Sequence, residues 1–242
     1  IIPPLKLYDA GVPDSAIHDL IANNVRIPDV VIGDMRAQMA ACRVASTQIA
    51  VVLDEYGEVT FLESVQALLD SSEAATRARL EEVPDGTYSF EDYLDNDGIT
   101  MDLRRKIQVA VTVKGSGIKF DFKGSDPQVG GPFNSPAAST ISAVYYIVRV
   151  ITDPSIPNNS GCFRPITVEL PLASIVNPTP PAPVNSRTAT VKRISDVLYG
   201  AMVQAVPHKL TAASSGQLLV MALGGIDPAT GRSYVTSELG SG

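Results

Sequence analysis

The hydrophobic residues of this chain change their spacing near residue 105, and this change limits the possible folds. Over residues 15–80 the apolar side chains recur every three or four positions, which is typical of helices with one buried face. Over residues 105–123 they alternate with polar side chains, as in two strands joined by a tight turn at Gly115-Ser116-Gly117. We therefore predict an α+β (mixed α/β) fold, with a helical N-terminal layer packed on a mixed β-sheet that contains a hairpin at about 105–123.

Local signals place the other elements. Asp14 or Ser15 can cap a first helix, Pro28 precedes a second helix that ends at Gly57, and a third ends before Pro84. Four elements are expected downstream: a helix capped by Ser135, a strand at 166–170, a helix at 191–205 and a buried strand at 214–225. This order predicts a helical segment at 1–85 and an α/β segment at 86–242.

The two ends of the chain are typical of segment boundaries. It starts Ile1-Ile2-Pro3-Pro4 without an initiator Met, and it stops at Gly240-Ser241-Gly242 just after a strand-like stretch. We expect an interior piece of a longer protein, with both predicted segments belonging to one larger domain that is truncated at both ends.

Composition limits the classes of partner that this chain is expected to bind. The net charge is −7 and no basic cluster is larger than Arg104-Arg105-Lys106, so a nucleic-acid partner is not expected. The longest apolar run, Leu218–Leu223, is too short to cross a bilayer, so a membrane partner is not expected either. Cys42 and Cys162 lie among apolar or structured neighbours, and we interpret them as two buried free thiols of a protein in the reducing cytoplasm.

The sequence shows no complete motif for catalysis or for a metal. The two histidines, His18 and His208, are not paired at ligand spacing, and neither C-x-x-C nor H-E-x-x-H occurs. A G-x-S-x-G elbow and a P-loop are also missing. The acidic run Glu91–Gly98 lacks the register of a calcium loop, so we predict a solvated acidic turn there. No metal ligands are predicted in this chain.

One stretch, Asp121–Pro136, has the features of a binding wall. It leaves a predicted strand, turns through Gly130-Gly131, and enters the N-terminus of a predicted helix. Backbone N–H groups at such a place, aided by the helix dipole, can hold an anion or an oxyanion. By spacing alone, the Asn134 amide is more often a helix cap than a ligand contact.

Several motifs follow one another in an order that resembles a known family. They are IGDMRAQMAA (Ile32–Ala41), GTYSFEDYLDNDG (Gly86–Gly98), DFKGSDPQVGGPFNSP (Asp121–Pro136), IPNNSGCFRPITVELP (Ile156–Pro171), IVNPTPPAPV (Ile175–Val184) and the stretch Pro207–Gly216. In order and spacing they are similar to the hydantoinase B/oxoprolinase family over essentially the whole chain. Two positions depart from the family pattern, Leu172-Ala173 in place of Glu-Gly and Asp126 in place of a hydroxyl residue.

The resemblance implies an enzyme component. Family members work with a hydantoinase A-type subunit or domain that binds ATP and activates the substrate oxygen, so a hetero-oligomer is expected. The reaction implied is the opening of a small cyclic amide, 5-oxoproline or a hydantoin; the alternatives are a component of an ATP-dependent ketone carboxylase and a non-catalytic scaffold. The family's divalent metal motifs precede the equivalent of Ile1, so this piece is expected to be inactive alone.

Five residues are candidates for the site. The match to the family motif suggests catalytic roles for Asp121 and Asn134, although Asp121 also fits a solvated charge ladder. Substrate binding is assigned to Arg164, Asp34 and Gln38. Arg164 can clamp a carboxylate or phosphate, or can instead fix the preceding loop. Asp34 and Gln38 lie one helical turn apart, but equally Asp34 can cap its helix and Gln38 can be a surface residue.

Overall fold

The computed structural model describes residues 4–213, 216 and 218–241. By its internal contacts the chain divides into two compact units, Ile1–Ser64 with Met221–Glu238, and Val65–Val220 with Leu239–Gly242. This division differs from the segments 1–85 and 86–242 predicted from sequence. Residues 65–85 group with the sheet-containing unit, and residues 221–238 return to the unit of the first helices.

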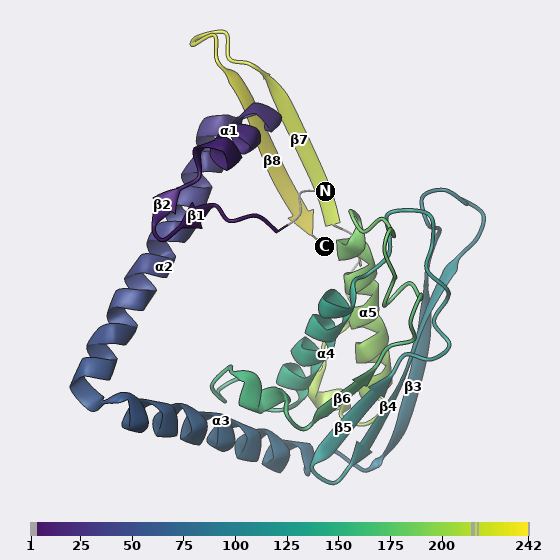
Figure 1. The fold of residues 1–242 in the computed structure, drawn as a ribbon. Coiled ribbons are helices and arrows are strands. Elements are labelled where there is room, and N and C mark those ends of the chain that lie inside the picture. Colours follow the sequence, from purple (N-terminus) through teal and green to yellow (C-terminus); the bar gives the residue numbers. More distant parts are fainter. Residues whose placement is uncertain (1–3, 214–215, 217, 242) are drawn as a thin grey trace. The chain divides into compact units, whose positions relative to one another are not determined.

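The first unit is built from long helices and two small sheets (Figure 1). Its elements are β1 (Tyr8–Asp9), β2 (Val12–Pro13), α1 (Ser15–Asn24), α2 (Pro28–Tyr56), the start of α3 (Glu58–Leu80), and most of the two-stranded sheet of β7 (Leu218–Ile226) and β8 (Ser233–Ser241). Asp14 caps α1 as expected, because its carboxylate accepts from the N–H groups of Ala16 and Ile17. Gly57 separates α2 from α3 at a φ of 79°, as predicted for a helix end.

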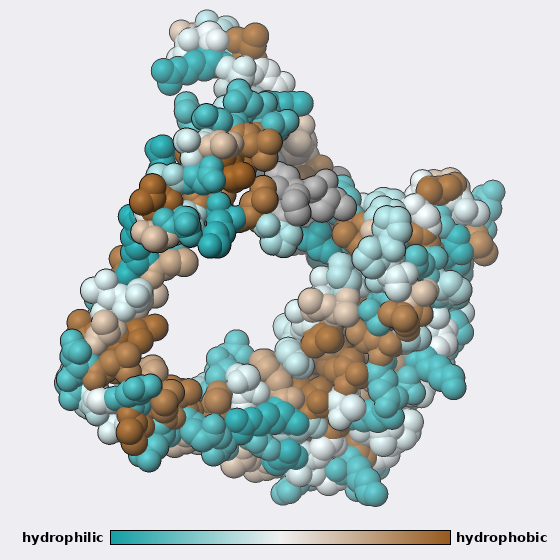
Figure 2. Space-filling view, viewed as in Figure 1, coloured by the Kyte–Doolittle hydropathy of each residue, from teal (hydrophilic) through white to brown (hydrophobic). Residues whose placement is uncertain are grey.

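Apolar side chains of the first unit are largely exposed. No residue of α2 is buried, and Figure 2 shows apolar side chains among polar ones on the surface of this helix. Two predictions are therefore wrong. Cys42 is a free thiol but an exposed one, and β7 is not a buried strand, since Val220 and Leu223 are about half exposed. The reason for the second is that β7 pairs only with β8. The remainder of that predicted strand, 214–215 and 217, lies outside the described residues.

The second unit is organised around one four-stranded sheet. Its strands are β3 (Gly86–Leu94), β4 (Arg105–Lys114), β5 (Gly117–Asp121) and β6 (Ile166–Glu169), in that order. The β3–β4 and β4–β5 pairs are antiparallel and β5–β6 is parallel, so the sheet is mixed and the predicted hairpin is confirmed. Gly115 takes a φ of 53° in the turn, which glycine adopts without strain.

Two helices pack on this sheet, α4 (Ala137–Ile151) and α5 (Arg187–Met202) (Figure 1). Two short 3₁₀ turns, η1 (Ser160–Phe163) and η2 (Pro207–Lys209), lie in the connections. The shared core consists of the inward side chains of β4 and β5 and the apolar faces of both helices, among them Ile107, Val109, Val111, Phe120, Val144, Ile147, Ile194 and Leu198. The predicted α+β class is confirmed.

Two predictions made from the sequence of this unit are wrong. The acidic run expected as a solvated turn begins as the last part of β3, and its Asp97 is buried, with an ion pair to Arg105. An edge strand with mostly exposed side chains lacks the apolar alternation that would have revealed it. Ser135 does not cap α4; its hydroxyl instead accepts from Thr140 at 3.1 Å, and Pro136 occupies the cap position. In the described part of the chain, no helix is long and apolar enough to cross a membrane.

Candidate functional site

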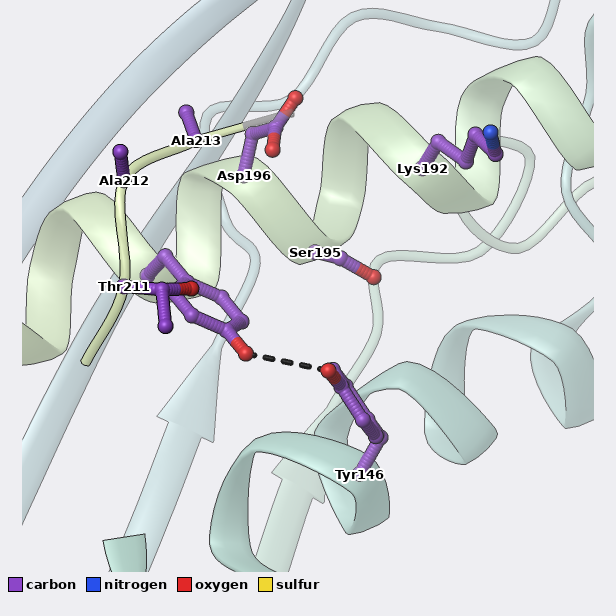
Figure 3. A pocket seen from close by; sticks show the side chains of 8 residues that line it. Tyr146, Lys192, Ser195, Asp196, Thr211, Ala212 and Ala213 are labelled. Atoms are coloured by element: carbon purple, nitrogen blue, oxygen red, sulfur yellow. Dashed lines mark hydrogen bonds between the residues drawn. The ribbon is translucent and has the colours of Figure 1, made fainter. Parts of the chain in front are cut away.

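The second unit contains a cleft along the exposed side of α5 (Figure 3). It has two adjoining lobes of about 180 and 350 Å³ that share Asp196, Tyr199 and the segment Thr211–Ala213. The first lobe, which is more polar, is completed by Tyr146 of α4 and by Lys192 and Ser195 of α5. The second lobe is mainly apolar and extends to Phe90 of β3 and Val203.

The amphipathic pattern of α5 forms this cleft. Its buried side chains, which include Ile194, Val197, Leu198 and Ala201, follow the three- and four-residue spacing of one helical face. The opposite face therefore presents polar side chains to the cleft. Gly200 allows β3 to approach the helix closely, because a Cβ added there would lie 2.4 Å from Cδ1 of Phe90. The Phe90 ring can thus form a wall of the apolar lobe.

Two tyrosines face each other at the polar lobe. The hydroxyls of Tyr146 and Tyr199 are 3.1 Å apart (Figure 3), and Thr211 lines the same lobe. Burial, followed by the hydrogen bond with Tyr146, raises the pKa of Tyr199 to about 12. Because the phenol then stays protonated throughout the physiological range, it acts as a hydrogen-bond donor and not as a base.

The charges that line the two lobes balance. Arg193 forms ion pairs with Asp92 and with Asp196, the latter at 3.5 Å. Together with Lys192 this makes two cationic and two anionic side chains around the cleft. The site therefore offers hydrogen-bond donors and acceptors with no net charge of its own.

The geometry suits binding more than covalent chemistry. The Ser195 hydroxyl donates to the carbonyl of Val191 at 3.0 Å, an ordinary bond within a helix. His208 lies in η2 and His18 in the first unit, and neither lines the cleft. Among the described residues, no group of three or more His, Cys, Asp or Glu side chains is placed to hold a metal ion.

The residues predicted from sequence lie outside this cleft. Asp121, at the end of β5, is partly buried, and its carboxylate accepts from the N–H of Lys123 at 2.8 Å. Arg164, which follows η1, forms ion pairs with Asp70 at 2.7 Å and Glu73 at 3.1 Å on α3. Arg164 thus fixes its loop to α3, the structural one of its two predicted roles. A catalytic role for Asp121 and a substrate role for Arg164 stay predictions.

Asn134 is fully buried and binds only backbone groups. Its amide oxygen accepts from Val129 N at 2.8 Å, and its amide nitrogen donates to the carbonyls of Val129, Gly131 and Pro183. It does not cap α4, so that expectation is wrong. The predicted anion wall is also closely packed, since a Cβ on Gly131 would lie 1.6 Å from the carbonyl oxygen of Asp97. The catalytic role of Asn134 stays a prediction that these contacts do not support.

Asp34 and Gln38 lie in the first unit, on α2, where both are exposed. Asp34 is the seventh residue of a helix that starts at Pro28, so it cannot be the cap. Sequence reasoning overlooked the cleft because Tyr146 and Tyr199 sit in helices whose apolar stripes dominate the pattern. Two stretches of the family resemblance were available signals, Pro207–Gly216, which supplies Thr211, and Gly86–Gly98, which supplies Phe90.

Comparison with known proteins agrees with the resemblance noted in the sequence. The family model described as hydantoinase B/oxoprolinase matches residues 1–242. The chain is 32% identical to the caprolactamase subunit beta of Pseudomonas jessenii, over 99% of the chain and 41% of that protein. It is 31% identical to the 5-oxoprolinase of Saccharomyces cerevisiae, over 79% of the chain and 15% of that protein.

Solved structures support the fold. The crystal structure of the ATP-dependent caprolactamase from Pseudomonas jessenii matches with a TM-score of 0.85 at 31% identity, covering 97% of this chain and 40% of that one. A nucleotide-free acetone carboxylase matches with the same TM-score at 15% identity, covering 96% and 33%, which shows a common fold only. The chain spans about 40% of the length of three of the curated relatives it matches, two of which are named as enzyme subunits.

Proposed function

The chain belongs to the hydantoinase B/oxoprolinase family, and on that premise we propose that it is part of an ATP-dependent enzyme that opens small cyclic amides. The reaction class is hydrolysis of a lactam-type ring, with 5-oxoproline or a hydantoin as substrate. An amide is inert because its C–N bond has partial double-bond character. Activation of its oxygen by ATP is what makes ring opening feasible at neutral pH.

The observation that carries this proposal is the likeness to the Pseudomonas jessenii caprolactamase, an ATP-dependent enzyme. This likeness combines nearly full coverage of the chain with 31% identity and the same fold. The relative at 31% identity in yeast is also named for a cyclic amide, 5-oxoproline. A ketone carboxylase component, the alternative that the family resemblance implies, is the second candidate function; acetone carboxylase shares the fold at 15% identity.

We propose a division of labour between this chain and a partner. ATP is bound by a hydantoinase A-type subunit or domain, and the assembly is a cytoplasmic hetero-oligomer. The described residues of this chain do not fit a metal centre, since His18 and His208 belong to different units and no acidic or thiol cluster accompanies either. From the family resemblance alone, we propose that a divalent metal is held in the N-terminal part of the full-length subunit.

A non-catalytic scaffold is a further alternative, and it is favoured by the contacts of two predicted site residues, buried Asn134 and ion-paired Arg164. Asn134 and Arg164 both hold loops in place, which is what a non-catalytic scaffold would need. Under this alternative, substitutions in this chain change stability or assembly, while turnover per folded complex stays the same.

The test uses the full-length subunit purified with its partner. The complex is incubated with ATP and, in parallel, with 5-oxoproline, hydantoin, caprolactam, and acetone plus bicarbonate. We expect ring-opened product and released phosphate with at least one cyclic amide, and no ring opening when ATP is omitted. Fixation of labelled bicarbonate onto the ketone, without opening of any cyclic amide, would instead establish the carboxylase.

A further inference from the structure

We propose that the cleft between Tyr146 of α4 and Phe90 of β3 is a binding site for a small neutral molecule that has a carbonyl-type oxygen and an apolar body. The oxygen accepts a hydrogen bond from the Tyr146 hydroxyl. The body lies in the apolar lobe against Phe90 and Val203. This inference concerns binding alone and does not depend on the proposed reaction.

The pair of phenol hydroxyls lets Tyr146 donate to a ligand. The hydroxyl of Tyr199 is 3.1 Å from that of Tyr146, and either oxygen can donate in this bond. When Tyr199 donates to Tyr146, the Tyr146 proton is left for a ligand. Paired hydroxyl bonds of this kind are cooperative, since one bond polarises the next, so Tyr146 is then a stronger donor than an isolated phenol. Tyr146 is 53% exposed and can therefore reach a ligand.

The balance of charge selects against ionic ligands. Lys192 and Arg193 are matched by Asp92 and Asp196 around the two lobes. An ionic ligand of either sign therefore gains no net attraction that would offset the cost of removing its charge from water. A neutral ligand avoids that cost and still satisfies the hydroxyl donors, as is usual for small-molecule sites with few, well-placed polar groups.

The apolar lobe has room for the body of the ligand. Its volume of about 350 Å³ lies in the range of roughly 300–1,000 Å³ that is usual for small-molecule cavities. Phe90 and Val203 are 40% and 42% exposed, so they present apolar surface that a ligand would remove from water. The two lobes meet at Tyr199, which places the donor at one end of the cleft and the apolar surface at the other.

The experiment measures ligand binding to the full-length subunit, without ATP, by calorimetry or ligand-observed NMR. The neutral probe is caprolactam and the anionic probe is 5-oxoproline. Tyr146→Phe removes the hydroxyl, and with it both the donor to the ligand and the hydrogen bond with Tyr199, while keeping the ring. Val203→Asp places a charge in the apolar lobe at an exposed position. The matched control is Tyr145→Phe, because Tyr145 precedes Tyr146 on α4 but stacks on Phe163 at 3.9 Å between ring centroids.

We expect saturable binding of the neutral probe, weakened about five- to tenfold by Tyr146→Phe, the worth of one hydrogen bond. Val203→Asp should weaken it at least as much, and Tyr145→Phe should leave it unchanged, with all variants folded by circular dichroism. The inference is overturned if the neutral probe does not bind, if 5-oxoproline binds more tightly, or if neither cleft variant changes the affinity. A complex that opens no cyclic amide yet shows this pattern would refute the proposed function and leave the binding site standing.

Discussion

The replacement of Asn134 by alanine gives the sharpest test of whether this chain's most prominent motif is catalytic or structural. The Asn134 side chain is fully buried and makes four hydrogen bonds to backbone atoms. Two of them join it to Val129, at 2.8 Å each, and a third joins it to Gly131 at 3.2 Å. The fourth, at 3.0 Å, reaches the carbonyl of Pro183 in the proline-rich connection.

The size of the effect follows from which of these groups water can reach after the substitution. Pro183 is exposed, so its carbonyl can be hydrated at little cost. Val129 and Gly131 are buried, so three hydrogen bonds are lost without replacement. At roughly 1 kcal/mol for each lost bond, and somewhat more for groups left buried and unsatisfied, we expect a loss of about 3–5 kcal/mol. For a domain of this size that lowers Tm by about 10 °C.

The assay compares Tm and turnover of the full-length complex. The matched control is Asn23→Ala on α1, an exposed position whose amide bonds only within its own helix, where we expect a change within about 0.5 kcal/mol. If Asn134→Ala lowers Tm and leaves turnover per folded complex intact at low temperature, its role is structural. An unchanged Tm with a large loss of turnover would refute this reasoning and restore the catalytic assignment.

Two further predictions concern loop packing and acid stability. Gly161→Ala should loosen the contact of η1 with α3, because the added Cβ would lie 2.0 Å from the Leu69 carbonyl oxygen. We expect faster amide hydrogen exchange in the second half of α3. The control Gly33→Ala, whose added Cβ meets nothing within 4 Å, should not have this effect. Hydrogen bonds hold the pKa of the Asp97 carboxyl below its usual 3.8; the largest contribution comes from the N–H of Thr100, and Arg105 is among the other donors. A carboxyl whose pKa is lower in the folded than in the unfolded protein stabilises the fold at pH values above its unfolded-state pKa. That stabilisation is lost as the pH falls through the folded-state pKa. Asp97→Asn should therefore flatten the decline of Tm below about pH 4, and an unchanged decline would contradict the assignment.

The sequence was sufficient wherever one buried face dictates the spacing of apolar residues. The strand with Ile107 and Val109 and the stripes of α4 and α5 pack into one core, so their period was readable without the structure. The turn at Gly115 was readable because a two-residue loop with positive φ favours glycine. These elements define the α+β class and position the helix that lines the cleft.

The sequence was insufficient where an element has no buried face or where a site is assembled across elements. β3 is an edge strand held by pairing with β4, and β7 pairs only with β8, so neither carries a reliable burial pattern. The cleft requires a tyrosine from α4, a tyrosine from α5 and Thr211 to meet. Tyrosine in an amphipathic helix usually completes an apolar stripe, so only packing reveals that these hydroxyls converge.

The segments that carry the family resemblance bind one another in the fold, and this bears on where function should be sought. The stretch 121–136 hydrogen-bonds to the stretch 175–184 through Asp126 O with Ile175 N, through Ser135 N with Ile175 O, and through Asn134 with Pro183. Similarly, Arg164 of the stretch 156–171 is held by acidic residues of α3. The backbone groups of Asp126 and Ser135 and the side chain of Asn134 hold irregular backbone in place, which buried loops require because their N–H and C=O groups need partners. The motif 121–136 can therefore identify the family through its architecture, while the α5 cleft is lined by two other stretches of the resemblance, with Phe90 from 86–98 and Thr211 from 207–216, and by Tyr146 and Tyr199 of the two helices.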